Sequence, residues 1–166
     1  KGYSPSSPPP MGMHGDLRAA SANPNVGAEI LSPIATEIEK QTIRWLADLV
    51  GVSPDYGGVL VSGGNMANFT AFLAGRAMKL PTEFKVQGMA ALKKQPMIYC
   101  SKATHTWIDK AAALFGHGLN AVRWIEVDNN NRMNISVLEE AIQQDIADHK
   151  QPMMVIGTAG DVSTGV

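Results

Sequence analysis

The sequence has almost no cysteine and no excess of charge of either sign. Cys100 is the single cysteine among 166 residues, which rules out a disulfide within the chain and favours a reducing compartment such as the cytoplasm. Fourteen Lys and Arg residues nearly balance fifteen Asp and Glu residues. This balance offers no electrostatic surface for nucleic acid or for an anionic membrane, so neither is expected as a partner.

Long apolar runs and metal-ligand spacings are also missing. No run approaches the ~20 apolar residues that cross a bilayer, and the first residues show neither an initiator Met nor a signal peptide, so the true start is expected upstream. No metal site is expected, because the four histidines lack ligand spacing. With 45% hydrophobic and 17% charged residues, the chain is expected to fold around a buried core.

Strands and helices are predicted to alternate along most of the chain. Prolines in residues 4–10 predict a loop, and Ser32 followed by Pro33 predicts the start of a helix that Gly51 ends. Four small residues of the next helix are predicted to pack closely on a sheet: Ala67, Ala71, Ala74 and Gly75. The predicted elements after Gly51 are strand 58–61, helix 65–80, strand 97–100, helix 106–115, strand 121–127, a helix opened by a capping box at residues 136–139, and strand 153–156.

This alternation is typical of an α/β protein with a mostly parallel sheet and helices on both faces. Ligands of such open sheets bind beyond the carboxyl ends of the strands. Three short segments follow predicted strands and are therefore the places to look for chemistry: residues 62–65, 104–106 and 157–158.

The first segment contains two adjacent glycines, Gly63 and Gly64, before a predicted helix. Glycine lets the backbone approach an anion, and the helix N-terminus offers unpaired N–H groups, so a phosphate would fit there. A tight turn in which Asn65 caps the helix explains the same residues. The segment is neither GxGxxG nor GxxxxGK[ST], so a dinucleotide fold or P-loop is not indicated.

His105 and Thr158 follow the other two strands. His105 could stack on a ligand or exchange protons with it, or serve as a structural hydrogen-bonding residue. Thr158 could donate to a ligand or complete a turn. Because the fold places all three segments at one edge of the sheet, a shared binding site is the favoured interpretation.

The sequence resembles the group II pyridoxal-phosphate-dependent amino-acid decarboxylases, which include the aromatic amino-acid and glutamate decarboxylases. The resemblance rests on four segments in family order: NPNVGAEILSPIATEIEKQTIRWLADLVG (23–51), GGVLVSGGNMANFTAFLAGR (57–76), SKATHTWIDKAAALFG (101–116) and GTAGDVSTGV (157–166). The resemblance implies a fold type I, aminotransferase-like architecture that works as a homodimer, with residues 1–51 as an N-terminal arm and helix and residues 52–166 as the first part of the large domain.

The resemblance also implies roles for individual residues. Gly63, Gly64 and Asn65 match the segment that holds the cofactor phosphate. His105 matches the catalytic histidine that stacks on the pyridine ring, and Thr158 matches a threonine near the ring. The stretches around three further residues look like those that border the substrate pocket: Tyr3, Val26 and Gly27.

In the family, the carboxylate that faces the ring nitrogen and the lysine that links to the cofactor lie beyond the segment matching residues 157–166. The 166-residue chain by itself is therefore expected to be inactive, and decarboxylation of an L-amino acid is expected of a full-length protein. Two alternatives stay open: another fold type I enzyme, such as a carbon–carbon lyase, and a non-catalytic anion-binding or interaction module.

Overall fold

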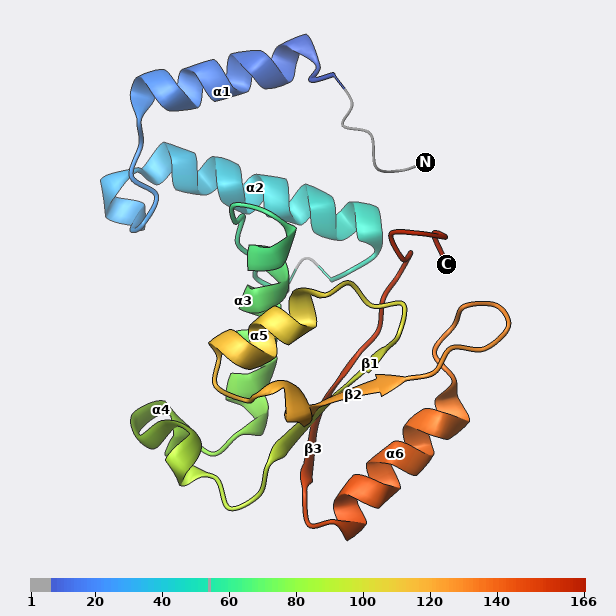
Figure 1. Ribbon diagram of the computed structural model, residues 1–166. Coiled ribbons are helices and arrows are strands. Elements are labelled where there is room, and N and C mark those ends of the chain that lie inside the picture. Colours follow the sequence, from blue (N-terminus) through green and yellow to red (C-terminus); the bar gives the residue numbers. More distant parts are fainter. Residues whose placement is uncertain (1–6, 54) are drawn as a thin grey trace. The chain divides into compact units, whose positions relative to one another are not determined.

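The computed structural model describes residues 7–53 and 55–166 (Figure 1). The chain divides into two compact units, unit 1, which ends at Ser62, and unit 2, Gly63–Val166. The predicted domain boundary between residues 51 and 52 lies inside unit 1 and stays a prediction. No helix in the described ranges is long and apolar enough to cross a membrane, and the same ranges hold no cluster of three potential metal-ligating side chains.

The described residues of unit 1 form two α-helices, α1 (Pro10–Ala22) and α2 (Pro33–Val50), and a 3-10 turn (Glu29–Leu31) between them. The predicted start and end of α2 are confirmed: Pro33 is its first residue, and Gly51 ends it with φ of 74°. Helix α1 was not predicted, although Pro10 at its first position is a common helix start. The apolar stripe of α2 is exposed in the described structure, and its members include Ile34, Ile38, Trp45 and Leu49.

Unit 2 is built on a three-stranded parallel sheet of β1 (Pro96–Ser101), β2 (Val122–Ile125) and β3 (Gln151–Ile156), in the order β2-β1-β3. In the central strand, Ile98 pairs with Val122 on one side and with Met154 on the other. The predicted α/β class with a parallel sheet is confirmed. Strand β1 is wholly buried.

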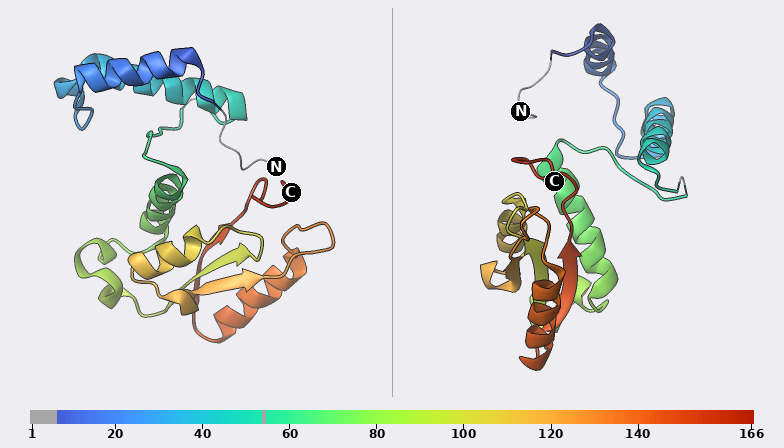
Figure 2. Two further views of the ribbon diagram at one scale, coloured as in Figure 1. Left: turned by 45° about the horizontal axis from the view of Figure 1, so that its top comes forward. Right: turned by 90° about the vertical axis from the view of Figure 1, so that its right-hand side faces the viewer.

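Helices cover both faces of this sheet because alternate residues of β1 point to opposite sides. Ile98 and Cys100 pack in a cluster with α3 (Gly64–Lys79) and α5 (Trp107–Leu114), whereas Met97 and Tyr99 pack in a second cluster with α6 (Ile135–Ala147). The left view of Figure 2 shows α5 and α6 on opposite sides of β1 and β2. The short helix α4 (Phe84–Gln87) and the 3-10 turn after it, Gly88–Ala91, were not predicted.

The predicted strand at residues 58–61 does not form. Val59 and Leu60 are exposed, and the backbone N–H of Leu60 donates instead to a carboxylate oxygen of Glu39, at 2.8 Å. A strand needs a neighbouring strand to satisfy its backbone groups, and no strand of the described residues pairs with this segment. The apolar run alone was therefore a misleading signal.

Two details of the helices also differ from the prediction. Helix α6 is capped by Asn134, whose Oδ1 accepts from the N–H of Val137 at 3.3 Å. The predicted capping box at residues 136–139 is therefore wrong, because the helix begins about half a turn earlier. In α3 the large residues Phe69, Phe72 and Leu73 pack on the core, and of the four small residues only Gly75 is partly buried. A Cβ at Gly75 would lie 2.8 Å from Cε of Met154, so this glycine marks the close approach of α3 to β3.

Candidate functional site

Four backbone ends meet at one end of unit 2. The C-terminal ends of β1 and β3 and the N-terminal ends of α3 and α5 all lie there (Figure 1). We call this the rim, and define it by the residues Gly63–Asn65, Ser101–Thr106 and Gly157–Asp161. The parallel sheet creates it, because parallel strands bring their carboxyl ends to the same edge.

The N-terminus of α3 is open. Gly63 is the residue before the helix, its φ is 137°, a conformation that favours glycine, and no side chain caps the helix. Asn65 is already inside the helix, so the alternative in which it caps the helix is wrong. A Cβ built at Gly63 or Gly64 meets no atom within 4 Å. Among the described residues, no side chain therefore caps the first N–H groups of α3.

Aromatic contacts join α3 to α5. The ring centroids of Phe69 and Trp107 are 6.4 Å apart. Phe69 is five residues after Gly64, which is a rise of about 7.5 Å along a helix at ~1.5 Å per residue, and Trp107 is two residues after His105. Phe69 also contacts Phe115, just beyond the end of α5, at 5.3 Å, so this packing holds α3 along the length of α5.

The ring of His105 is exposed and held by one hydrogen bond. Its Nδ1 accepts from the backbone N–H of Trp107 at 3.2 Å. Because Nδ1 is the acceptor, the proton of the neutral ring is on Nε2. The hydrogen bond fixes the orientation of the imidazole while its face stays accessible.

Thr158 forms a hydrogen bond with Thr104, in the loop that follows β1. The hydroxyl oxygens of Thr104 and Thr158 are 3.1 Å apart, and those of Ser101 and Thr104 are 3.4 Å apart. Ser101 and Thr104 are each only 6% exposed, whereas Thr158 is exposed. A line of three hydroxyl groups thus runs from the interior to the surface.

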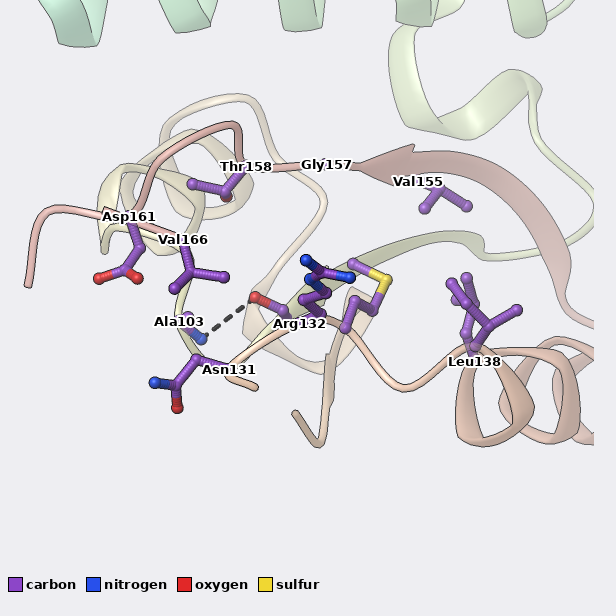
Figure 3. Close-up of a pocket in the computed structure, with 12 residues that line it drawn as sticks. Ala103, Asn131, Arg132, Leu138, Val155, Gly157, Thr158, Asp161 and Val166 are labelled. Carbon is purple, nitrogen blue, oxygen red and sulfur yellow. Dashed lines mark hydrogen bonds between the residues drawn. The ribbon is translucent and has the colours of Figure 1, made fainter. Parts of the chain in front are cut away.

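Two hollows open at the rim. The first, the His105 hollow, has a volume of about 530 Å³ and is lined by His105, Thr104 and the loop 161–164, among others. The second, the Thr158 hollow, has a volume of about 300 Å³ and lies beneath Thr158 and Gly157 (Figure 3). Asp161 lines both hollows, as do Ala103 and Asn131. Their volumes suit water or small ligand groups.

Asp161 shapes the loop that separates the two hollows. Its Oδ1 accepts from the backbone N–H groups of Ser163 and Thr164, at 2.7 Å and 2.8 Å, and its Oδ2 accepts from the hydroxyl of Thr164. The Thr164 hydroxyl and these N–H groups hold the pKa of Asp161 below its usual value. Both oxygens of the Asp161 carboxylate thus accept hydrogen bonds from within the loop itself.

Charged side chains also border the His105 hollow. Lys102, which lines it, forms an exposed ion pair with Glu126. Lys110 is exposed on α5. Cys100 lies under the rim and is fully buried, and its burial raises the thiol pKa to about 12, with a smaller contribution from Asp109. A thiol with that pKa is not a nucleophile at neutral pH.

Five of the predicted site residues belong to the rim: Gly63, Gly64, Asn65, His105 and Thr158. Neither of the two hollows is lined by the glycine turn. Val26 and Gly27 lie in unit 1, where the N–H of Gly27 donates to Oδ1 of Asn25 at 2.9 Å, and Tyr3 lies outside the described residues. Roles for all eight residues stay predictions.

Three residues at the rim were missed as site residues: Ser101, Thr104 and Asp161. Thr104 lies beside His105 in the sequence, but its bond to Thr158 spans 54 residues and has no local signal. Asp161 does have a local sequence signal. An Asp side chain commonly accepts from backbone N–H groups two or three residues later, and the sequence Asp161-Val162-Ser163-Thr164 is typical of such a turn.

Known proteins resemble the chain along almost all of its length. An aromatic-L-amino-acid decarboxylase of Bacillus atrophaeus is 32% identical over 155 residues, which are 93% of this chain and 30% of that protein. An L-aspartate decarboxylase of Metarhizium robertsii is 35% identical over 162 residues, 97% of this chain and 32% of that protein. The crystal structure of mouse CSAD matches with a TM-score of 0.90 and 28% identity, and the match covers 97% of this chain and 33% of that one.

The chain thus spans about a third of the length of the curated relatives it matches. Residues 3–166, nearly the entire sequence, match one family description, "Pyridoxal-dependent decarboxylase conserved domain". The fold agrees with that match, since the parallel sheet and the helices on both of its faces superpose on a solved structure at a TM-score of 0.90. The chain belongs to the pyridoxal-dependent decarboxylase family.

Proposed function

We propose that the full-length protein decarboxylates an L-amino acid with pyridoxal phosphate, and that this chain contributes the phosphate-binding turn and the ring-stacking histidine. Pyridoxal phosphate is the cofactor of the family to which the chain belongs. The observation that carries the proposal is that α3, which follows the glycine turn, and α5, which follows His105, both begin at the same end of unit 2 (Figure 1).

The start of α3 has the features that a phosphate group requires. Gly63 and Gly64 leave the backbone uncovered, no side chain occupies the cap position, and the helix is long enough to present a partial positive charge. The N–H groups at the start of α3 would donate to the phosphate oxygens. The residues present therefore fit an anionic group.

The other side of the rim fits a flat aromatic ring. The exposed imidazole of His105 is held by the Trp107 N–H, so it can lie against a ring without losing its own hydrogen bond. Stacked aromatic groups lie with centroids about 4.5–7 Å apart. Thr158, bonded to Thr104 behind it, would contact the edge of the same ring.

Bound pyridoxal phosphate supplies an electron-accepting ring that takes up the electron pair left when carbon dioxide departs from an amino acid. The residues of this chain would bind the cofactor and orient its ring. His105 keeps the ring in one plane, the start of α3 anchors the phosphate, and Thr158 fixes rotation of the ring. Fixed orientation matters because the bond that breaks has to stand perpendicular to the ring.

Other features of the proposal rest on the resemblance. The relatives act on different amino acids, aromatic L-amino acids in one case and L-aspartate in another, so an L-amino acid is the substrate class proposed. Homodimer assembly, borders of the substrate pocket at Tyr3, Val26 and Gly27, and location in the cytoplasm are part of the same proposal. The single cysteine supports the last of these.

The test is to express the full-length gene product, add pyridoxal phosphate, and measure carbon dioxide release from a panel of L-amino acids. The proposal expects a bound cofactor with visible absorbance and carbon dioxide released in equal amount to the amine formed. Cleavage of a carbon–carbon bond without carbon dioxide would support the rival fold type I lyase. Absence of cofactor binding would support the non-catalytic alternative.

A further inference from the structure

The three hydroxyl groups at the rim can share their protons in two ways that give the buried proton of Thr104 an acceptor among the described residues. Thr104 lies between Ser101 and Thr158, so its single proton goes to one neighbour and it accepts from the other. In the inward arrangement Thr158 donates to Thr104 and Thr104 donates to Ser101. In the outward arrangement Ser101 donates to Thr104 and Thr104 donates to Thr158.

The surroundings of Ser101 distinguish the two arrangements. Its Oγ already accepts from the backbone N–H of Ala103 at 3.2 Å, the bond drawn as a dashed line from Ala103 in Figure 3. In the inward arrangement the Oγ of Ser101 would accept a second hydrogen bond, and the Ser101 hydroxyl proton would have no acceptor among the described residues. Ser101 is only 6% exposed, so that proton would be buried. A buried donor without an acceptor is costly, so the outward arrangement is favoured.

The outward arrangement leaves one proton unused, and that proton is on the exposed hydroxyl of Thr158. From this geometry we infer that Thr104 is a positioning residue that makes Thr158 a hydrogen-bond donor toward an electron-rich acceptor atom of the ligand at the rim. The inference rests on the proposed function for the identity of that ligand. Thr104 acts through Thr158 and does not itself reach the ligand.

The chain of donors gives each residue a different expected effect. Thr104→Val keeps the shape of the side chain but removes the acceptor and donor beside Thr158, which then rotates freely. Ser101→Ala removes the inner hydroxyl, yet the buried proton of Thr104 still has Thr158 as its acceptor, so Thr158 keeps its outward direction. Ser101→Ala also leaves the N–H of Ala103 without its acceptor, which lowers stability and not ligand affinity.

The experiment measures the affinity of the full-length protein for pyridoxal phosphate by equilibrium dialysis without substrate, together with the visible circular dichroism of the bound cofactor. Thr104→Val and Thr158→Val are each expected to weaken affinity by roughly five- to tenfold, the worth of one hydrogen bond. The double variant is expected to match Thr158→Val, because Thr104 acts only through Thr158. Thr104→Ser is expected to restore affinity.

Two controls separate positioning from folding. Ser101→Ala is expected to lower the urea midpoint but to change affinity by less than about twofold. Thr70→Val, which removes a hydroxyl on α3 that donates to the carbonyl of Met66, is expected to leave both the affinity and the dichroism unchanged.

The inference is wrong if Thr104→Val binds as tightly as the unmodified protein with the same dichroism, or if Ser101→Ala weakens affinity as much as Thr104→Val does. If the unmodified protein binds no pyridoxal phosphate, the proposed function fails together with this inference. If the unmodified protein binds pyridoxal phosphate but the variants rank differently in affinity than expected, the proposed function stands and only this inference is wrong.

Discussion

The rings of Phe69 and Trp107 lie 6.4 Å apart between centroids at an angle of 57°, and this contact connects two helices that begin at the rim. Trp107 is buried, so the contact is part of the core as well as part of the support for the site. Packing inside unit 2 therefore connects the helix that follows the glycine turn with the helix that follows His105, as the proposed function requires.

Replacing Gly64 with Val should weaken the binding of pyridoxal phosphate. No atom lies within 4 Å of a Cβ at this position, so the free protein has room for the side chain, and only a bound phosphate would meet it. Affinity measured by fluorescence titration should fall while the urea midpoint changes little. Ala67→Val, at an exposed position one turn later in α3, is the matched control for a β-branched residue in a helix. Equal affinity in the Gly64 variant would mean that the turn is only structural.

Replacing His105 with Ala should leave the cofactor bound but slow turnover, since the ring loses its stacking partner. A small misplacement of reacting groups costs about 10²-fold in rate, and we expect a loss of that order in kcat. His105→Phe keeps an aromatic face and should recover part of the rate. Turnover that is unchanged in the Ala variant would remove the stacking role.

Asp145 is expected to be the most sensitive buried polar residue of unit 2. It is 1% exposed and accepts hydrogen bonds from Arg123, Lys150 and Tyr99. Burial alone would raise its pKa, but these donors, Arg123 first, hold the pKa below its usual value. Asp145→Asn removes the charge that Arg123 faces and should cost about 3 kcal/mol.

Two variants calibrate that value in urea unfolding. Tyr99→Phe removes one of the hydrogen bonds and should cost about 1 kcal/mol. Asp148→Asn removes an exposed partner of Lys150 and should cost less than about 0.5 kcal/mol. A cost for Asp145→Asn no larger than that for Asp148→Asn would show that the network contributes little to stability.

His117 should make stability fall in mild acid. It is 5% exposed, neither ring nitrogen has a hydrogen-bond partner among the described residues, and it faces the ring of Phe72. Burial lowers its pKa, and the charge of Arg76 lowers it further. The unfolded chain takes up a proton below about pH 6.5 that the folded protein does not, so stability decreases as the pH falls below that value.

The measurement is the free energy of unfolding between pH 7.5 and 5, for the natural protein and for His117→Phe. This range lies above the ordinary pKa of 3.8 for an Asp side chain, so the lowered pKa of Asp145 does not contribute to the slope. The variant should show a smaller decrease with pH. The same slope in both proteins would show that His117 does not control it.

Local sequence signals predicted those elements whose stabilising contacts are themselves local or strongly apolar. Pro33 and Gly51 mark the ends of α2, and the apolar run of β1 marks a central strand. The rim followed from the alternation of strands and helices, because parallel strands place their carboxyl ends together. Those predictions needed only the order of the elements.

Two of the failures share one physical cause, which is dependence on distant parts of the chain. Residues 58–61 have the composition of a strand, yet a strand also needs a partner. The hydrogen bond between Thr104 and Thr158 joins two loops 54 residues apart, and no sequence pattern near either threonine predicts it. Side-chain direction is the other limit: Ala67 is small enough to pack on the sheet, but Phe69 and Phe72 take the buried face of α3.

The most direct test is a crystal structure of the full-length protein with pyridoxal phosphate bound. The account predicts phosphate oxygens within about 2.7–3.2 Å of backbone nitrogens at the start of α3, with the ring of the cofactor stacked on the imidazole of His105. A phosphate bound away from Gly64, or a ring that does not touch His105, would contradict it.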